Sequence, residues 1–158
     1  MRVIGLRRRP EASAGDPLVA EVLPLDARLD LMGRADDVVI ATPLTPETRG
    51  LIGRAEIAAM KPTATLVNLG RGPVIDEDAL VEALQAGRIR GAALDVFTAE
   101  PHPAGHPFYR LDNVLLSPHC ADHKAGWLEE AMHFFLGNLA RFRRGEPLEN
   151  VVDKRRGY

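Results

Sequence analysis

Residues 64–87, ATLVNLGRGPVIDEDALVEALQAG, hold a strand, a turn and a helix in succession. The run over 64–69 is short and mostly apolar, as is typical of a buried strand. The spacing predicts a helix over 76–86, because Asp76 can cap its first turn, apolar side chains recur at helical intervals and Gly87 can end it. A strand joined by a turn to a helix is the repeating unit of an α/β fold.

The same alternation extends along the chain. Strands are predicted over 2–6, 20–23, 37–42, 64–69, 91–96 and 113–117, and helices over 26–34, 54–60, 76–86 and 126–144. Several strands are apolar without alternating polar positions, a pattern expected when helices cover both faces of a parallel sheet. The sequence therefore predicts an α/β fold with a Rossmann-like, doubly wound parallel sheet, followed by a C-terminal helix and tail.

This predicted sheet is incomplete at its beginning. A buried strand is expected already at 2–6, with nothing ahead of it to cover it. In a doubly wound nucleotide-binding fold the first strand is central and leads into a glycine-rich turn that carries the pyrophosphate. No G-x-G-x-x-G pattern follows a predicted strand, since Gly70 and Gly72 lack the third glycine. We expect the first strand and its phosphate loop to be missing.

Composition excludes several classes of protein. The 158 residues are 46% hydrophobic, enough to fill the core of one ordinary domain. A net charge of −2 gives no field that would favour nucleic acid or an anionic membrane as a partner. Cys120 is the one cysteine, which excludes an internal disulfide and fits a reducing compartment. No apolar run approaches the roughly 20 residues of a membrane span, so a soluble, cytoplasmic protein is expected.

Arg71 is the first candidate for a functional residue. It stands between Gly70 and Gly72, directly after the predicted strand 64–69. Ligands of open α/β folds bind at the carboxyl edge of the sheet, and the forked donors of a guanidinium suit a carboxylate. A surface arginine in a flexible turn is the alternative interpretation.

Acidic and imidazole side chains follow the next two predicted strands. Asp95 and Glu100 come at and after the end of 91–96, and His119 follows 113–117. Side chains at the tips of neighbouring strands can meet in one cleft. A carboxylate beside an imidazole favours the charged ring, which makes a general acid available near neutral pH. Alternatively, His119 after Pro118 is a structural turn residue.

Ordered motifs occur nearly from end to end of the chain. They comprise PLTPETRGLI at 43–52, NLGRGPVID at 68–76, LDVFTAEP at 94–101, SPH at 117–119, GEPL at 145–148 and NVVD at 150–153. With this order and spacing the chain resembles the C-terminal part of the D-isomer-specific 2-hydroxyacid dehydrogenases.

The resemblance implies a catalytic triad of Arg71, Glu100 and His119. The arginine would bind the carboxylate and carbonyl of a small 2-oxo acid, the histidine would exchange a proton with the 2-oxygen, and the acid would orient and charge the histidine. A nicotinamide cofactor would carry the hydride. The implied cofactor contacts are Thr42, Pro43, Leu69, Gly70 and Asp95. Among members of the family, a hydroxypyruvate or glyoxylate reductase is a plausible match.

The residues at the end of strand 2–6 bear on the choice between NAD and NADP. The NAD-preferring pattern places an acid there, whereas this chain continues from Leu6 into Arg7 and Arg8. Guanidinium groups can pair with a 2′-phosphate that an acid would repel. We therefore favour NADP over NAD. In the other interpretation the arginines only solvate the strand end.

The resemblance also implies a division of the chain. Residues 1–125 correspond to a truncated dinucleotide-binding domain, and 126–158 to a C-terminal helix and tail that in the family return to an absent substrate domain. Leu128, Ala131, Met132, Phe135, Leu139 and Phe142 share one face of that helix, which would lack its partner. We expect the isolated chain to bind nicotinamide cofactor weakly or not at all.

Two other functions remain open. The fold could serve as a non-catalytic module for dimerisation or cofactor sensing, or the chain could be an inactive truncation product; intact members of the family are expected to be homodimers. Residues 120–124, CADHK, also depart from the small residue, glycine and threonine usual after the family histidine. That departure puts the substrate contacts of this segment in doubt.

The other histidines and the cysteine are weaker candidates for functional residues. His119 and His123 are two ligands where a catalytic zinc needs three, so no metal site is predicted. Cys120 is expected to be a packing residue, with a nucleophilic Cys-His pair as the alternative. His102 and His106 stand in a Pro-rich loop and are expected to be solvated.

Overall fold

A computed structural model describes residues 1–13 and 15–155 of the chain. It divides into two compact units, Met1–His119 and Cys120–Tyr158. Every predicted site residue lies in the first unit.

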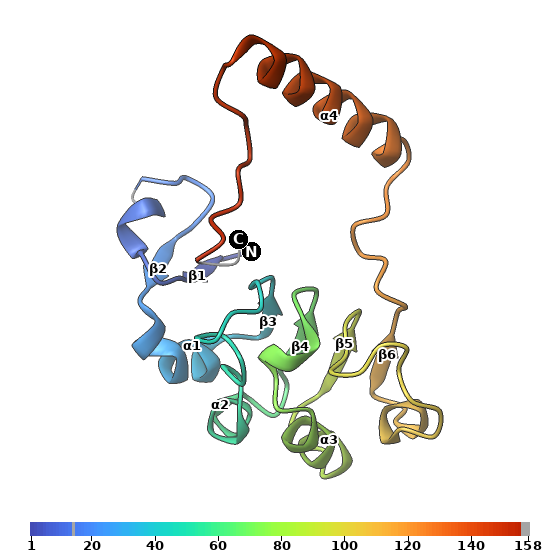
Figure 1. Cartoon of the computed structure of the whole chain (residues 1–158). Helices are drawn as coiled ribbons and strands as arrows, with labels where there is room; N and C mark the ends of the chain where they lie inside the picture. The colour runs from blue at the N-terminus through green and yellow to red at the C-terminus, as the bar shows by residue number, and fades with distance from the viewer. Residues whose placement is uncertain (14, 156–158) are drawn as a thin grey trace. The chain divides into compact units, whose positions relative to one another are not determined.

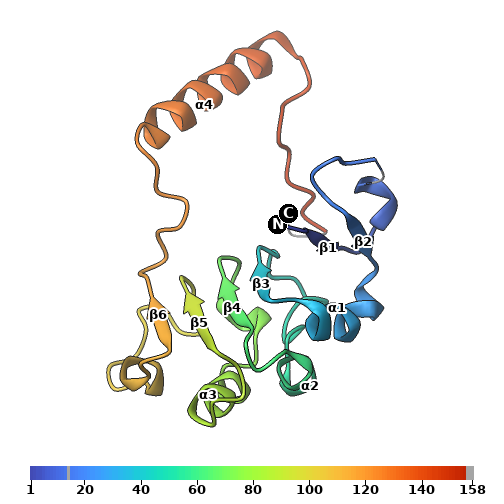
Figure 2. The same ribbon diagram turned by 180° about the vertical axis from the view of Figure 1, so that it is seen from behind.

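The first unit contains two parallel sheets (Figure 1). The smaller pairs β1 (Ile4–Leu6) with β2 (Glu21–Leu23). The larger has the order β3-β4-β5-β6, formed by β3 (Asp37–Ile40), β4 (Thr65–Asn68), β5 (Gly91–Leu94) and β6 (Val114–Leu116). Figure 2 shows these strands from behind, side by side in chain order. All six predicted strands form, each shorter than its apolar run.

Helices alternate with the strands as the hydrophobic pattern predicts. They are α1 (Arg28–Arg34), α2 (Arg54–Ala59) and α3 (Glu77–Gln85), with short 3₁₀ turns η1 (Pro10–Ser13), η2 (Leu25–Ala27), η3 (Gly72–Val74) and η4 (Pro107–Arg110). Asp76 caps α3 as expected, since its carboxylate accepts from the Ala79 N–H at 3.1 Å. The segment 26–34 is helical in two pieces, a 3₁₀ turn followed by α1.

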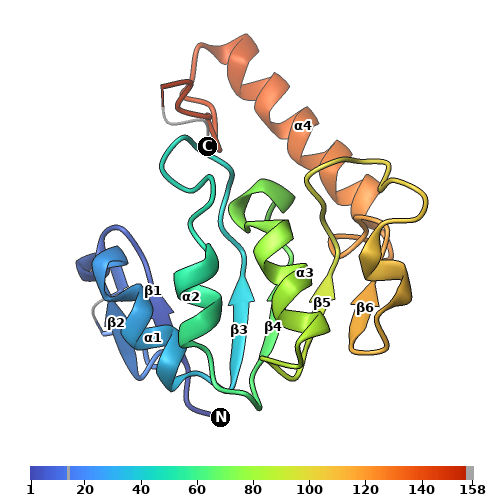
Figure 3. The same ribbon diagram turned by 90° about the horizontal axis from the view of Figure 1, so that it is seen from below.

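Helices α1, α2 and α3 lie next to one another in chain order, with α1 beside the smaller sheet and α2 and α3 on one face of the larger sheet (Figure 3). Burial along β3 accordingly alternates: Val38 and Ile40 are buried, whereas Val39 is 60% exposed. Leu115 in β6 is also exposed. The predicted Rossmann-like α/β fold with a parallel sheet is confirmed. Within residues 1–119, helices cover one face of this sheet and leave Val39 and Leu115 exposed on the other, contrary to the expectation of helices on both faces. The apolar side chains of the second face led to it, because they read like those of a strand buried on both sides.

The core lies between the larger sheet and these helices. Its fully buried side chains are Met32, Ile57, Met60, Leu66, Val74, Leu80, Ile89 and Phe108. Burial of apolar area at this layer is the main force that holds the strand ends, and with them the site, in place.

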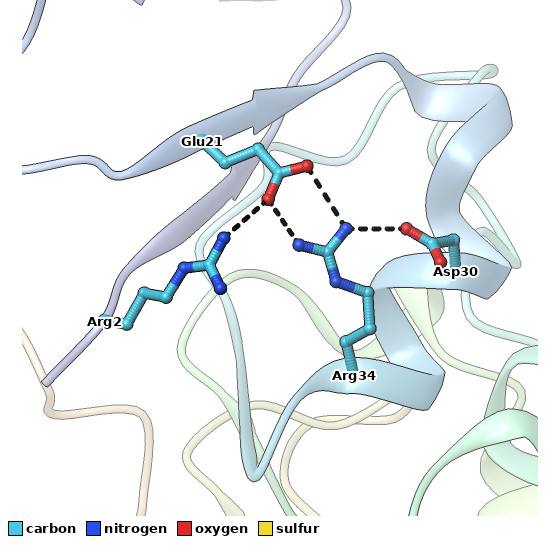
Figure 4. Close-up of polar contacts among 4 residues, drawn as sticks. All are labelled: Arg2, Glu21, Asp30 and Arg34. Carbon is cyan, nitrogen blue, oxygen red and sulfur yellow. Dashed lines mark hydrogen bonds and ion pairs between the residues drawn. The ribbon is translucent and has the colours of Figure 1, made fainter.

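An ionic network ties the smaller sheet to α1 (Figure 4). Glu21 of β2 accepts from Arg2 at 3.1 Å and from Arg34 of α1, and Arg34 also contacts Asp30 at 2.8 Å. The hydrogen bond from Arg34 lowers the pKa of the Glu21 carboxyl. One guanidinium thus joins a strand to the helix that follows it.

The second unit is built around α4 (Trp127–Arg144), which begins after Gly126 and ends at Gly145, both left-handed. Glu149 of the tail accepts from Arg141, and its N–H donates to Asn138 Oδ1 at 2.9 Å. No residue of α4 is buried, and the predicted apolar face, including Phe135 and Phe142, is exposed. Among the described residues, no helix combines the length and apolar character needed to cross a membrane.

Candidate active site

The turn that carries Arg71 is shaped by a buried amide. Asn68, the last residue of β4, is 1% exposed. Its Oδ1 accepts from the Gly70 N–H at 3.0 Å, and its Nδ2 donates to the Arg71 carbonyl at 3.2 Å. A side chain on Gly70 would place its Cβ 2.7 Å from the Thr42 carbonyl oxygen. The turn after β4 therefore packs closely on the segment after β3.

Arg71 itself is exposed at the carboxyl end of β4. Its Nη1 donates to the Gly70 carbonyl at 2.7 Å, which holds the side chain against its own turn. A guanidinium has five N–H donors, so this bond leaves donors for a carboxylate ligand.

Glu100 and His119 meet in the structure. His119 Nδ1 lies 2.8 Å from Glu100 Oε2, and the Phe97 N–H donates to Glu100 Oε1 at 2.9 Å. The backbone of His119 is left-handed, with φ 51°. A non-glycine residue in that region is strained by about 1 kcal/mol or more, and such strain clusters at functional sites.

The groups around Glu100 favour its ionised form. A hydrogen bond from His119 lowers the pKa of the Glu100 carboxyl below its ordinary value, with further lowering by the Phe97 N–H and by the charge of Arg71. Gly72, the residue after Arg71, packs against the Phe97–Thr98 peptide of the loop that carries Glu100. The three residues predicted as a triad gather at one edge of the sheet.

Asp95 follows β5 and is 3% exposed. Ser117, at the end of the neighbouring β6, donates its hydroxyl hydrogen to Asp95 Oδ1. This bond fixes the carboxylate at the carboxyl edge of the sheet, between the strands that lead to Glu100 and His119.

The remaining predicted contacts at this edge follow β3 and β4. The Leu69 N–H donates to the Ile40 carbonyl at 2.9 Å, and the Pro43 carbonyl accepts from the Thr48 hydroxyl at 2.6 Å. Thr42 faces Gly70 across the close approach described above. Thr42, Pro43, Leu69 and Gly70 therefore form one cluster.

Arg7 and Arg8 directly follow β1 of the smaller sheet. The Arg7 N–H extends the β1–β2 ladder to the Leu23 carbonyl at 3.0 Å, and its guanidinium contacts the Ser13 hydroxyl. The Thr45 hydroxyl lowers the pKa of Glu47, and the charge of Arg8 contributes to the same lowering. Both guanidinium groups thus stand at the carboxyl end of β1, near polar partners.

Two features of the site were not predicted. The buried Asn68 had a place in the quoted motif but no assigned role, and Glu77 of α3 accepts from the Thr98 N–H at 2.5 Å. Two signals could have found them: a polar residue inside an otherwise apolar strand, and an acid directly after a helix cap.

His102 corrects a prediction. It was expected to be solvated, yet both ring nitrogens are buried and have no hydrogen-bond partner within the described part of the chain. The ring stacks on Phe97 and also contacts His106 and Tyr109. Desolvation lowers the pKa of His102, with a further contribution from His106. No group of three or more His, Cys, Asp or Glu side chains suited to a metal occurs among the described residues.

Comparison with known families gives one clear match. The family model described as D-isomer specific 2-hydroxyacid dehydrogenase, NAD binding domain, matches residues 1–121.

Individual relatives agree with this match. The chain is 41% identical over 154 residues to a glyoxylate reductase of Thermococcus gammatolerans, covering 98% of this chain and 45% of the relative. It is 42% identical over 153 residues to glyoxylate/hydroxypyruvate reductase B of Pectobacterium carotovorum, covering 97% and 47%. The chain therefore spans about half the length of the curated relatives it matches.

Solved structures show the same similarity. A D-isomer specific 2-hydroxyacid dehydrogenase of Xanthobacter autotrophicus, in complex with NADPH and MES, superposes with a TM-score of 0.90 at 40% identity, covering all of this chain and 63% of the other. An NADPH-dependent glyoxylate/hydroxypyruvate reductase of Sinorhizobium meliloti, in complex with NADP and sulfate, gives a TM-score of 0.86 at 32% identity, covering 100% and 50%.

Proposed function

The chain belongs to the D-isomer-specific 2-hydroxyacid dehydrogenases, through their NAD-binding domain, and on that premise we propose that it serves hydride transfer between NAD(P) and a small 2-hydroxy or 2-oxo acid. The observation that carries the proposal is the 2.8 Å contact between His119 Nδ1 and Glu100 Oε2, beside Arg71. Hydrogen-bonded acid and imidazole groups at the carboxyl edge of a parallel sheet are suited to proton transfer.

Each residue of the triad has a distinct task in this proposal. Because Nδ1 of His119 faces Glu100, its Nε2 is the nitrogen that exchanges a proton with the 2-oxygen of the substrate. Glu100 fixes the orientation of the imidazole. Arg71 binds the substrate carboxylate through its fork of donors and places carbon 2 for reaction.

The cofactor supplies the hydride when bound. The residues present suit its two ends: Thr42, Gly70 and the buried Asp95 for the nicotinamide side, and Arg7 and Arg8 for the adenosine side. We favour NADP over NAD, because two guanidinium groups at the end of β1 suit a 2′-phosphate. That phosphate would compete with Glu47 for Arg8.

The substrate is a small 2-oxo acid, with glyoxylate and hydroxypyruvate as the first candidates because relatives are named for them. We also propose that 1–125 acts as the dinucleotide-binding part and that 126–158 packs on a substrate domain. A homodimer and a cytoplasmic location complete the proposal. The exposed apolar face of α4 favours a second candidate function, a dimerisation module without turnover.

Reduction of glyoxylate and hydroxypyruvate, followed by the absorbance of NADPH and NADH, tests the proposal. The assay uses the chain itself and a fusion placed behind the upstream half of the Thermococcus gammatolerans reductase. We expect weak or no cofactor binding by the chain alone, measured by calorimetry, and turnover by the fusion. His119→Gln should lower kcat roughly a hundredfold to ten-thousandfold.

His123→Gln is the matched control, since it changes an exposed histidine four residues away and should leave kcat unchanged. Full activity in His119→Gln would overturn the catalytic assignment. Replacing Arg7 and Arg8 together by Ala should raise KM for NADPH more than for NADH, and equal effects would overturn the cofactor preference. A soluble dimer without turnover in the fusion would favour the module.

A further inference from the structure

The carboxylate of Glu100 is positioned by backbone on its own loop. The Phe97 N–H donates to Glu100 Oε1 at 2.9 Å, while Oε2 faces His119. The direction in which Glu100 points therefore depends on where the backbone of residues 97–98 lies. Thr98, Ala99 and Glu100 are exposed, so packing of their own side chains gives this backbone little support.

Two contacts from a different part of the chain hold this backbone. Gly72 approaches the peptide between Phe97 and Thr98 so closely that an added Cβ would lie 1.9 Å from the Phe97 carbonyl carbon and 2.3 Å from the Thr98 nitrogen. The N–H of that same peptide donates to Glu77 Oε1 at 2.5 Å. Gly72 packs against this peptide, and Glu77 accepts a hydrogen bond from its N–H.

Both contacts come from the segment that begins with Arg71. Gly72 is the next residue, and Glu77 is the first residue of α3, directly after its cap Asp76. A carboxylate in the first turn of a helix is favoured by the partial positive charge of the helix N-terminus, and a carboxylate oxygen is a strong hydrogen-bond acceptor. Two residues that follow Arg71 therefore hold one peptide of the Glu100 loop in place.

We propose that Glu77 is a positioning residue that, through the Thr98 N–H, sets Glu100 and its bond to His119 relative to Arg71. This role rests on the proposed function, because it concerns the same triad. Glu77 touches neither the substrate nor the reacting atoms in this proposal. Its effect passes through one backbone hydrogen bond.

Three substitutions separate positioning from general stability. Glu77→Asp keeps the charge at the helix start but withdraws the acceptor by one methylene, Glu77→Ala removes the acceptor, and Glu77→Gln keeps an acceptor oxygen without the charge. Glu82→Ala is the matched control, because Glu82 lies on the same helix and its carboxylate pairs with Arg54 and not with the Glu100 loop.

Amide hydrogen exchange at Thr98 is the direct readout, on the full chain. We expect protection at Thr98 in the unsubstituted protein and a loss of about tenfold or more in Glu77→Asp and Glu77→Ala, since a hydrogen bond to a charged group is of that strength. Glu77→Gln should retain part of the protection, because its amide oxygen still accepts but without the charge, and Glu82→Ala should retain all of it. Exchange at Thr98 as fast as in an unstructured peptide, in the unsubstituted protein, would overturn the proposal without any variant.

NMR titration of the Glu100 carboxyl carbon is the second readout. The pKa of Glu100 should rise toward its ordinary value in Glu77→Asp and Glu77→Ala, and should stay low in Glu77→Gln and Glu82→Ala. An unchanged Glu100 titration in Glu77→Asp, together with a lower unfolding midpoint, would show a structural role only and overturn the proposal. Neither readout requires turnover, so they can succeed or fail independently of the proposed enzymatic activity.

Discussion

The imidazole of His102 stacks on the ring of Phe97, with centroids 4.1 Å apart and planes inclined by 26°. Phe97 is also the residue whose N–H holds Glu100. An aromatic cluster that includes a buried histidine thus adjoins the loop that carries a site carboxylate.

Replacement of His102 by Phe should stabilise the protein. The substitution keeps the stacked ring and removes two buried nitrogens that lack partners. Each such nitrogen lowers the free energy of unfolding by about 1–3 kcal/mol. Burial lowers the pKa of His102 below 6.5, so the unfolded chain binds a proton more readily and stability falls as pH drops below that value. The stabilisation by His102→Phe should therefore be larger at about pH 5.5 than at about pH 8.

Urea unfolding at the two pH values measures this difference. His123→Phe, at an exposed histidine in the second unit, serves as the control for the added ring and should not stabilise the first unit. Equal gains for His102→Phe at both pH values would contradict the assignment of a buried neutral ring.

Gly72→Ala should destabilise the first unit by about 2–4 kcal/mol, because the new methyl group meets backbone that cannot turn aside. Gly33→Ala is the contrasting variant: its added Cβ would lie 3.6 Å from the nearest atom outside α1, and alanine favours a helix. Thermal unfolding should show a lower midpoint for the first and an equal or higher midpoint for the second. A neutral Gly72→Ala would mean that the Arg71 turn and the Phe97 loop are not packed together.

Asn68→Ala should cost about 2 kcal/mol in the free energy of unfolding, because it leaves the Gly70 N–H and the Arg71 carbonyl without their side-chain partner. Asn113→Ala removes a single, longer bond to the Leu84 carbonyl at 3.3 Å and should cost less. Chemical denaturation ranks the two variants. The reverse order would show that the Arg71 turn is held by other contacts.

Arg34→Ala should lower the unfolding midpoint at low salt, because it removes contacts to both Glu21 and Asp30. Arg2→Ala removes one contact to Glu21 and should have the smaller effect. Both effects should shrink in about 0.5 M NaCl, since exposed ion pairs are screened. A salt-independent loss in Arg34→Ala would indicate that the aliphatic part of the side chain, rather than its charge, supports α1.

Short apolar runs were enough to predict the strands of the first unit, and apolar residues at helical intervals were enough to predict its helices. The ends of the strands were not predictable, since Asp95 and Val96 are as buried as the strand residues before them. Whether a second layer covers Val39 and Leu115 is likewise invisible in their apolar character.

At the site, the meeting of Glu100 with His119 could be foreseen because both follow neighbouring strands. The roles of Asn68 and Glu77 could not, since a bond from one side chain to the backbone of a separate loop has no periodic signal. His102 was misjudged for a related reason: its burial comes from stacking on Phe97 within an irregular loop, where composition suggests exposure.

The strands of the larger sheet have the same order in the chain and in space. Each strand can therefore pair with the one made just before it, and no distant segment has to be brought back to close the ladder. Short loop closures have a small entropic cost and correlate with fast folding. Assembly from β3 toward β6 during synthesis would thus complete the strand that leads to Arg71 before the strand that leads to His119.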